Sequence, residues 1–291
     1  MNESILVIGA DGLIGRALVE RLERSGRGCV ATTRRRPATG PRRIHLDLES
    51  TETWNIPLGV DSAILCAAIT GEERIRDDPV RAAAVNVRSA IQLSRRLAAE
   101  GIFVTFLSSS LVFDGEVPRV PPAARTNPRT AYGRLKADSE RRLQGEIDGL
   151  AIVRLSKVFS SGSPLLRAWR NMLSAGCKVE ALSDYPCAPL DLTDSVDAIS
   201  RVASECRRGI WQLSPYDDVS YEEIAREVAR RCGADSRLVE PVPSSERLGR
   251  THVPAHATLD TARAREELGC EFPPMPAVLA RIWDAQGGPS R

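Results

Sequence analysis

Short apolar runs alternate along the first half of the chain with longer stretches in which apolar residues recur every three or four positions. An apolar run without polar alternation predicts a strand buried on both faces, whereas the wider spacing predicts an amphipathic helix. We expect strands at residues 4–8, 29–33, 44–48, 62–67, 102–107 and 150–155. Helices are expected from Leu13 onward and at about 79–100 and 130–145. Right-handed β-α-β connections turn this order into a doubly wound parallel sheet.

After about residue 160 the pattern becomes shorter and less regular. Helices are expected at 164–175, 193–206 and 221–231, and strands at 178–182 and 210–213. We therefore predict an α/β fold with a dinucleotide-binding Rossmann domain over residues 1–160 and a smaller C-terminal substrate-binding lobe over residues 161–291. The segment at about 186–213 is expected to return to the first domain.

Composition and charge exclude several classes of protein. No run of 18 apolar residues exists, so a membrane span is not expected. Forty basic residues against 38 acidic ones give a net charge of +2, which provides no broad basic surface for nucleic acid. The seven cysteines are scattered and form no Cys-x-x-Cys pair, which argues against a disulfide framework and a zinc site. His252 and His256 flank Pro254, which disrupts a helix, so no metal site is assigned to them. The scattered cysteines fit a reducing compartment, and the chain is expected to be cytoplasmic.

A glycine-rich turn follows the first expected strand and begins the first helix. It contains Gly9-Ala10-Asp11-Gly12-Leu13-Ile14-Gly15, the spacing of a dinucleotide-binding turn. Gly9 permits the tight turn, Gly12 lets backbone N–H groups approach a pyrophosphate, and Gly15 allows the helix to pack closely on the strand. The helix N-terminus adds partial positive charge at the same place. We predict cofactor contacts along this turn, the alternative being a glycine turn without a ligand.

The end of the second expected strand indicates which dinucleotide is bound. NAD-binding proteins usually place an acidic residue there for the ribose hydroxyl, but this chain has Arg34 and Arg35. A guanidinium forms forked hydrogen bonds to a 2'-phosphate, which a carboxylate would repel. The sequence therefore predicts NADPH in preference to NAD. The alternative is a solvated arginine cluster.

Tyr132 and Lys136 form the strongest catalytic candidate. On a helix the two side chains lie one turn apart on the same face. With only four tyrosines and three lysines in the chain, such a pair is uncommon by chance. Nearby positive charge lowers the pKa of a phenol, so Tyr132 can donate a proton to a developing alkoxide. Ser109, at the end of an expected strand, can hydrogen-bond the same oxygen.

Together the glycine turn, the segment Ser-Ser-Ser-Leu-Val-Phe-Asp-Gly at residues 108–115 and the Tyr-x-x-x-Lys pair resemble an extended short-chain dehydrogenase/reductase. The chain is most similar to the dTDP-4-dehydrorhamnose reductase group. This resemblance implies Ser109 as the catalytic hydroxyl, Tyr132 as the acid, Lys136 as its activator and Asn86 as a structural or water-relay partner. Further candidates for cofactor contacts, at the ends of expected strands, are Asp47, Leu48 and Ala67.

The sequence departs from this group on the substrate side. Ser110-Leu111 stands where the group usually carries Asp-Tyr, and Lys157 stands where it tends to carry Trp. The particular sugar therefore does not follow from the resemblance. Ser110, Lys157 and Arg167 are candidate substrate contacts, the two cations for a nucleotide diphosphate, although solvated or ion-paired side chains are the alternative.

The expected activity is an NADPH-dependent reduction of a keto group on a nucleotide-activated deoxysugar or a related compound. A 4-epimerase is one alternative, but such enzymes retain NAD, which fits poorly with Arg34 and Arg35. A 4,6-dehydratase needs an acid and a base that Ser110 and Leu111 do not supply. A noncatalytic subunit resembling the beta subunit of methionine adenosyltransferase is another alternative. The expected partner is a small-molecule substrate, without nucleic acid or membrane, and the resemblance allows a homodimer.

Overall fold

The computed structural model describes residues 4–36, 39–40, 42–248 and 253–284. It divides into two compact units. The first unit comprises Met1–Phe113, Arg125–Arg154 and Ser195–Trp211. The second comprises Asp114–Ala124, Leu155–Asp194 and Gln212–Arg291. These ranges differ from the expected boundary at 160, because residues 114–124 pack with the second unit and the segment that returns to the first unit is shorter than expected.

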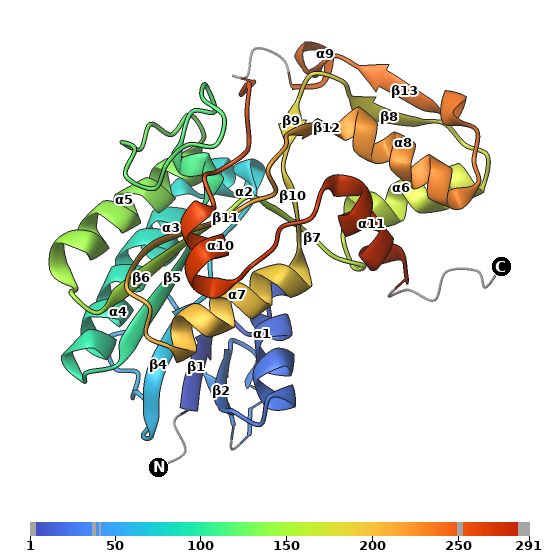
Figure 1. Ribbon diagram of the computed structural model, residues 1–291. Coiled ribbons are helices and arrows are strands. Elements are labelled where there is room, and N and C mark those ends of the chain that lie inside the picture. The colour runs from blue at the N-terminus through green and yellow to red at the C-terminus, as the bar shows by residue number, and fades with distance from the viewer. Residues whose placement is uncertain (1–3, 37–38, 41, 249–252, 285–291) are drawn as a thin grey trace. The chain divides into compact units, whose positions relative to one another are not determined.

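A seven-stranded sheet in the order β11-β6-β5-β4-β1-β2-β3 forms the centre of the first unit (Figure 1). Its strands are β1 (Ser4–Ile8), β2 (Gly28–Thr33), β3 (Arg43–His45), β4 (Val60–Leu65), β5 (Phe103–Ser109), β6 (Leu150–Leu155) and β11 (Gly209–Leu213). Strand β1 pairs in parallel with both β2 and β4, β2 with β3, and β4 with β5. The chain reverses its direction of winding between β1 and β4, which confirms the doubly wound sheet and marks the ligand-binding edge of this fold.

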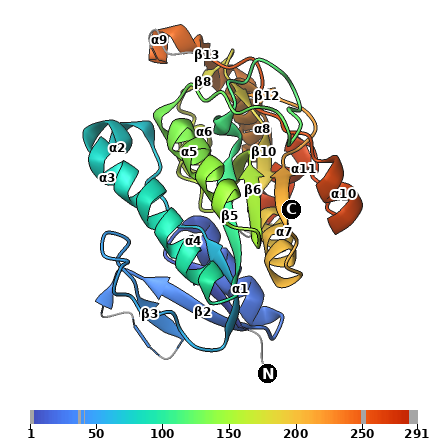
Figure 2. The same cartoon turned by 90° about the vertical axis from the view of Figure 1, so that its left-hand side faces the viewer.

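Helices cover both faces of this sheet (Figure 2). They are α1 (Leu13–Arg24), α2 (Glu72–Asp77), α3 (Pro79–Ala83), the π-helix η2 (Ala84–Ser89), α4 (Ala90–Ala99), the 3-10 turn η3 (Ser110–Val112), α5 (Ala131–Glu146) and α7 (Leu192–Ser204). The core beneath α4 and α5 is aliphatic and aromatic, with Leu6, Val104, Phe106 and Ile152 almost fully buried. The helix expected at 79–100 forms, but with a π-helical segment in its middle.

The second unit has shorter elements. Its three small strand pairs are β7 (Lys157–Phe159) with β10 (Pro189–Asp191), β9 (Pro186–Cys187) with β12 (Val219–Ser220), and β8 (Val179–Leu182) with β13 (Val239–Val242). Its helices are α6 (Pro164–Ser174), α8 (Tyr221–Cys232), α9 (Ser244–Leu248), α10 (Ala262–Leu268), α11 (Met275–Asp284) and the 3-10 turn η4 (Ser236–Leu238). Helices α6 and α8 share an apolar core that includes Trp169, Ile224 and Leu279.

The expected helices and long strands form within a few residues of their expected bounds, except that the third strand is shorter, because only Arg43–His45 pairs with β2. The sequence pattern missed α2, α9, α10, α11 and most of the small strands of the second unit. All of these except α11 contain two to seven residues, too few for a period to emerge, and α11 lies in a tail that was expected only to be interrupted by prolines. Among the described residues, no helix has both the length and the apolar character needed to span a bilayer.

Candidate active site

The glycine turn follows β1 and leads into α1. Gly9 has a φ of 94°, and a Cβ on it would lie 2.7 Å from the backbone of Ala67. A Cβ on Gly15 would lie 2.3 Å from the carbonyl oxygen of Gly9, so α1 packs directly on the turn. Gly12 begins α1 without a side-chain cap, and a Cβ there would meet only the Gly9 oxygen at 3.4 Å. The turn is therefore closed on its inner side and leaves the first N–H groups of α1, at Leu13 and Ile14, suited to a pyrophosphate.

Asp11 is held by the neighbouring strands. Its carboxylate accepts hydrogen bonds from the Thr33 hydroxyl at 2.8 Å and the Arg43 guanidinium at 2.6 Å. Burial by itself raises the pKa of Asp11, but these two hydrogen bonds and the charge of Arg43 bring that pKa below its ordinary value. Because Thr33 ends β2, the Asp11 carboxylate lies at the end of this strand. NAD-binding proteins usually carry an acidic residue there, and this chain has none at that position of the sequence. Arg43 was not predicted as a site residue, because it lies 32 residues from Asp11 and has no local sequence signal.

Arg34 and Arg35 directly follow β2, and both side chains are exposed. The backbone N–H of Arg35 donates to the Thr33 hydroxyl at 3.0 Å, which turns the chain at the end of the strand. Arg34 and Arg35 therefore follow directly after Thr33, whose hydroxyl donates to the Asp11 carboxylate, and Arg43 forms an ion pair with that carboxylate.

The other expected cofactor contacts lie at strand ends. Ala67 follows β4, and its N–H donates to the carbonyl of Ile8 in β1 at 3.1 Å. Asp47 caps a turn by accepting from the backbone of Glu49, and the carbonyl of Leu48 accepts from the Ser89 hydroxyl. Asp47 and Leu48 thus have structural hydrogen bonds of their own, whereas Ala67 contacts the glycine turn directly.

Tyr132 and Lys136 both lie on α5, which packs against the end of β5. The Thr130 hydroxyl caps α5 by accepting from the Gly133 N–H at 3.0 Å. A Cβ on Gly133 would lie 2.0 Å from the carbonyl oxygen of Leu111 in η3, so only glycine allows this close approach. The Lys136 ammonium donates to the carbonyl of Leu107 at 2.7 Å, two residues before Ser109 in β5. These contacts bring Ser109, Tyr132 and Lys136 to one end of the sheet.

Burial controls the protonation of both groups on α5. It raises the pKa of Tyr132 to about 12. It lowers the pKa of Lys136 to about 8, although Glu140 and Cys66 oppose that shift. The Lys136 ammonium lies 4.4 Å from the centre of the Phe106 ring and 5.8 Å from that of Tyr132. Nearby positive charge was expected to lower the pKa of the Tyr132 phenol, but in the polypeptide by itself burial raises that pKa.

Ser109 ends β5 and is half-buried. Its oxygen accepts from the backbone N–H of Leu111 at 3.2 Å, which orients the hydroxyl at the start of η3. An acceptor lone pair is thereby occupied, so the Ser109 proton remains suited to donation toward a carbonyl oxygen.

Asn86 is almost fully buried in the π-helix η2. Its side-chain oxygen accepts from the Ile69 N–H at 2.7 Å, and its amide nitrogen donates to the Ile69 carbonyl at 2.9 Å. The Asn86 backbone carbonyl accepts from the Ser139 hydroxyl on α5 at 3.0 Å. The Asn86 side chain therefore holds the segment after β4. This geometry supports a structural role for Asn86 over the role of water-relay partner, the other role that the resemblance implies.

Glu140, one helical turn beyond Lys136, forms a buried fork with Arg154 of β6. The two side chains are 1% and 2% exposed and approach to 2.7 Å. The Arg154 guanidinium also lies 4.9 Å from the centre of the Phe113 ring. This pair fixes α5 against the sheet one turn beyond Lys136, a role that was not predicted from the sequence.

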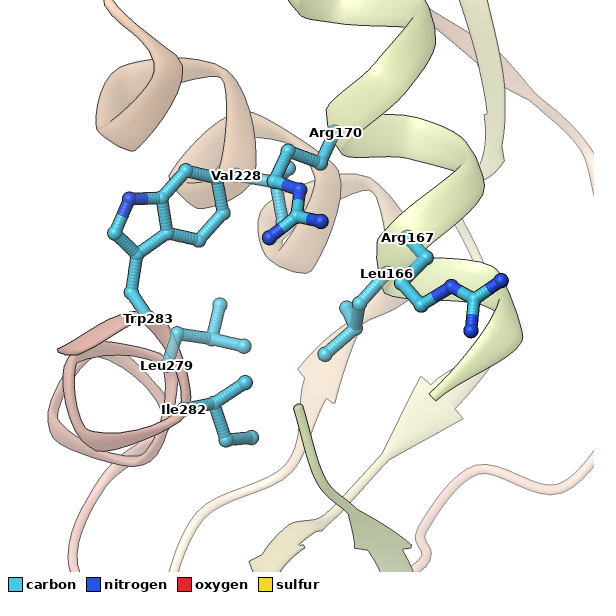
Figure 3. A pocket seen from close by; sticks show the side chains of 7 residues that line it. All are labelled: Leu166, Arg167, Arg170, Val228, Leu279, Ile282 and Trp283. Atoms are coloured by element: carbon cyan, nitrogen blue, oxygen red, sulfur yellow. The ribbon is translucent and has the colours of Figure 1, made fainter. Parts of the chain in front are cut away.

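The candidate substrate contacts lie in both units. Ser110 is a half-buried residue of the first unit that begins η3. Lys157 and Arg167 belong to the second unit and are both exposed. Arg167 lines a small pocket between α6, α8 and α11, whose other lining residues are Leu166, Arg170, Val228, Leu279, Ile282 and Trp283 (Figure 3).

No cluster of metal-ligating side chains occurs among the residues that the structure describes. His256 instead lies 3.0 Å from Asp218, a carboxylate that also accepts from Ala257 and Thr258. His252 lies outside the described residues.

The parallel sheet, the glycine turn and the Tyr-x-x-x-Lys helix together define an extended short-chain dehydrogenase/reductase. Within that class, the chain belongs to the family described as "RmlD substrate binding domain", whose model matches residues 2–286.

Two curated relatives and one solved structure illustrate the similarity. The chain is 27% identical over 258 residues to dTDP-4-dehydrorhamnose reductase of Mycobacterium tuberculosis strain H37Rv, covering 84% of this chain and 81% of the relative. It is 26% identical over 290 residues to methionine adenosyltransferase 2 subunit beta of Bos taurus, covering 92% and 83%. The crystal structure of dTDP-4-dehydrorhamnose reductase from Bacillus anthracis in complex with NADP superposes with a TM-score of 0.84 at 19% identity, covering 98% of this chain and all of that one.

Proposed function

We propose that the protein is an NADPH-dependent reductase that converts a keto group of a nucleotide-activated deoxysugar to a hydroxyl group. The observation that carries this proposal is the convergence of Ser109, Tyr132 and Lys136 at the end of β5, in the unit that also contains the glycine turn. Family membership and the curated reductases at 25–29% identity support the same reaction class.

The side chains divide the chemistry among them. Bound NADPH would supply the hydride. Ser109 donates a hydrogen bond to the carbonyl oxygen and positions it, and Tyr132 gives its proton to that oxygen as the negative charge develops. Lys136 is one turn along α5, where its ammonium stabilises the phenolate that remains. The high phenol pKa set by burial keeps Tyr132 protonated at neutral pH, which is the form that reduction requires.

The preference for NADPH rests on the cations near β2. Arg34 and Arg35 follow the strand, and Arg43 reaches the same end of β2 through Asp11. A 2'-phosphate can exchange with Asp11 as the partner of Arg43, and guanidinium groups bind phosphate through paired hydrogen bonds. A titration of the protein with NADPH and NADH, followed by nucleotide fluorescence, tests this preference. Equal affinities would contradict it.

Ser110, Lys157 and Arg167 remain proposed substrate contacts, with the two cations suited to a diphosphate. A conservative test replaces each cation with glutamine and measures KM. A rise in KM with an unchanged kcat supports binding to the substrate, because such a change removes ground-state interactions.

A noncatalytic subunit is the second candidate function, since a curated relative at 26% identity is a methionine adenosyltransferase beta subunit. One experiment separates the two. The protein is incubated with NADPH and a panel of nucleotide 4-ketosugars, and the loss of NADPH absorbance is recorded for the wild type and Tyr132→Phe. Turnover reduced by a factor of about 10²–10⁴ in the variant supports the reductase. Cofactor binding without turnover on every substrate favours the subunit.

A further inference from the structure

Glu72 of α2 contacts the backbone at the start of the helix that carries Tyr132. One of its carboxylate oxygens accepts from the Tyr132 N–H at 3.1 Å, and the other accepts from the Ala131 N–H at 3.2 Å. These donors are 59 and 60 residues away in the sequence. Both belong to the first unit, as does Glu72.

The two contacts complete the first turn of α5. A helix begins with N–H groups that have no partner within the helix, and Thr130 satisfies the one at Gly133. Glu72 satisfies the preceding two, including that of Tyr132 itself. A carboxylate is also favoured by the partial positive charge of a helix N-terminus. The backbone of Tyr132 is therefore fixed from outside its own helix.

A second set of contacts determines where Glu72 lies. Both hydrogen-bonding groups of the Asn86 amide are used on Ile69, three residues before Glu72. Gly71, with a φ of 95°, then turns the chain into α2. The Asn86 backbone carbonyl accepts from the Ser139 hydroxyl on α5. The contacts therefore run from α5 through Asn86 and Ile69 to Glu72, which returns to the start of α5. This closed path gives the exposed Glu72 a defined position.

We propose that Glu72 is a positioning residue for proton transfer: it holds the Tyr132 backbone so that the phenol meets the substrate oxygen. The proposal rests on the proposed reductase function, because it assigns Tyr132 the role of proton donor. Glu72 does not itself touch the substrate in this scheme.

The test compares Glu72→Gln with Glu73→Gln. Glu73 is the adjacent exposed residue of α2, so its variant removes the same charge from the same short helix and leaves the two Glu72 hydrogen bonds in place. Steady-state rates of 4-ketosugar reduction are measured for both. Glu72→Gln is expected to lower kcat about ten-fold with KM within a factor of about two, since displaced reacting groups slow the chemical step more than binding. Glu73→Gln is expected to match the wild type.

A titration that needs no turnover provides the second measurement. The ultraviolet absorbance of the Tyr132 phenolate is obtained as the difference between each protein and its Tyr132→Phe counterpart as pH is raised. Because burial raises the phenol pKa, loosening the first turn of α5 in Glu72→Gln is expected to expose the phenol to water and move its titration about 0.5 pH unit lower, whereas Glu73→Gln is expected to leave it in place. Glu72→Asp keeps the charge with a shorter side chain, and its kcat is expected between those of Glu72→Gln and the wild type.

The proposal is overturned if Glu72→Gln and Glu73→Gln share one kcat and one phenol titration. It is also overturned if only KM changes in Glu72→Gln. Failure of the reductase function has a different signature, because no substrate would then turn over with the wild type, while the phenol titration would still compare the two variants.

Discussion

The two parts of the candidate site in the first unit are built on different physical grounds. The glycine turn depends on steric fit of the backbone, since added Cβ atoms at Gly9 and Gly15 would approach neighbouring backbone atoms to 2.7 and 2.3 Å. The start of α5 also depends on steric fit at Gly133, but its chemistry comes from buried ionisable groups. Backbone shape prepares the glycine turn, whereas the start of α5 combines shape with the shifted protonation equilibria of two buried groups. Substitutions that alter one of these factors should therefore separate the two regions.

The largest effect is expected for Gly133→Ala. Its Cβ would lie 2.0 Å from a backbone oxygen of η3, so α5 must move away from Ser109 or the fold must distort. Overpacking of this kind costs about 1–3 kcal/mol, and displacement of Tyr132 should abolish most activity. Urea unfolding and steady-state kinetics measure the two effects. Gly145→Ala, on the same helix with open space around it, is the control and should be unchanged or slightly more stable.

The next effect distinguishes two glycines of one turn. Gly15→Ala meets the Gly9 oxygen at 2.3 Å and should lose stability, whereas Gly12→Ala meets it only at 3.4 Å. Gly12→Ala should therefore keep its free energy of unfolding within about 1 kcal/mol, yet bind NADPH more weakly, because its methyl group occupies the path of the pyrophosphate. Thermal unfolding and nucleotide titration are measured on both variants. Normal nucleotide affinity in Gly12→Ala would contradict the proposed position of the pyrophosphate.

A third experiment examines the buried charge at the catalytic end. Burial lowers the pKa of Lys136 from 10.5 to about 8, so between these pH values the native state has lost a proton that the unfolded chain still binds. The free energy of unfolding of the wild type relative to Lys136→Met should therefore rise by roughly 3 kcal/mol between pH 7.5 and 10.5. Other titrating groups largely cancel in this difference. A difference that stays flat with pH would show that Lys136 has its ordinary pKa.

The smallest effect concerns the ion pair between Asp11 and Arg43, because both side chains are about one third exposed and solvent screens their interaction. Asp11→Asn removes the carboxylate that competes with a 2'-phosphate for Arg43. Affinity for NADPH relative to NADH should rise about two- to five-fold. The ratio is measured by fluorescence titration of each nucleotide, so that any general change in the turn affects both equally. An unchanged ratio would remove Asp11 and Arg43 from cofactor selection.

Sequence reasoning was most reliable where the signal was local. The alternation of buried strands and amphipathic helices predicted the doubly wound sheet, and helical spacing predicted that Tyr132 and Lys136 share a face. The pairs that complete the site are instead distant in sequence. Asp11 and Arg43 are 32 residues apart, and Glu72 and Tyr132 are 60 residues apart. No periodicity or propensity relates such residues, because only the folded chain brings them together.

The π-helical segment between Ala84 and Ser89 shows how one additional residue within a helix can be retained. The wider turn leaves room for Ser139 to donate to the carbonyl of Asn86, while the amide of Asn86 faces the loop after β4. Deleting a single residue there would allow an uninterrupted α-helix, which is locally the more favourable conformation. The helical parts on either side of the deletion would keep their orientation, because the bulge already accommodates the extra residue, but the wider turn that lets Asn86 serve both neighbours would be lost. An irregularity that weakens the helix is thus a condition for joining three segments of the chain.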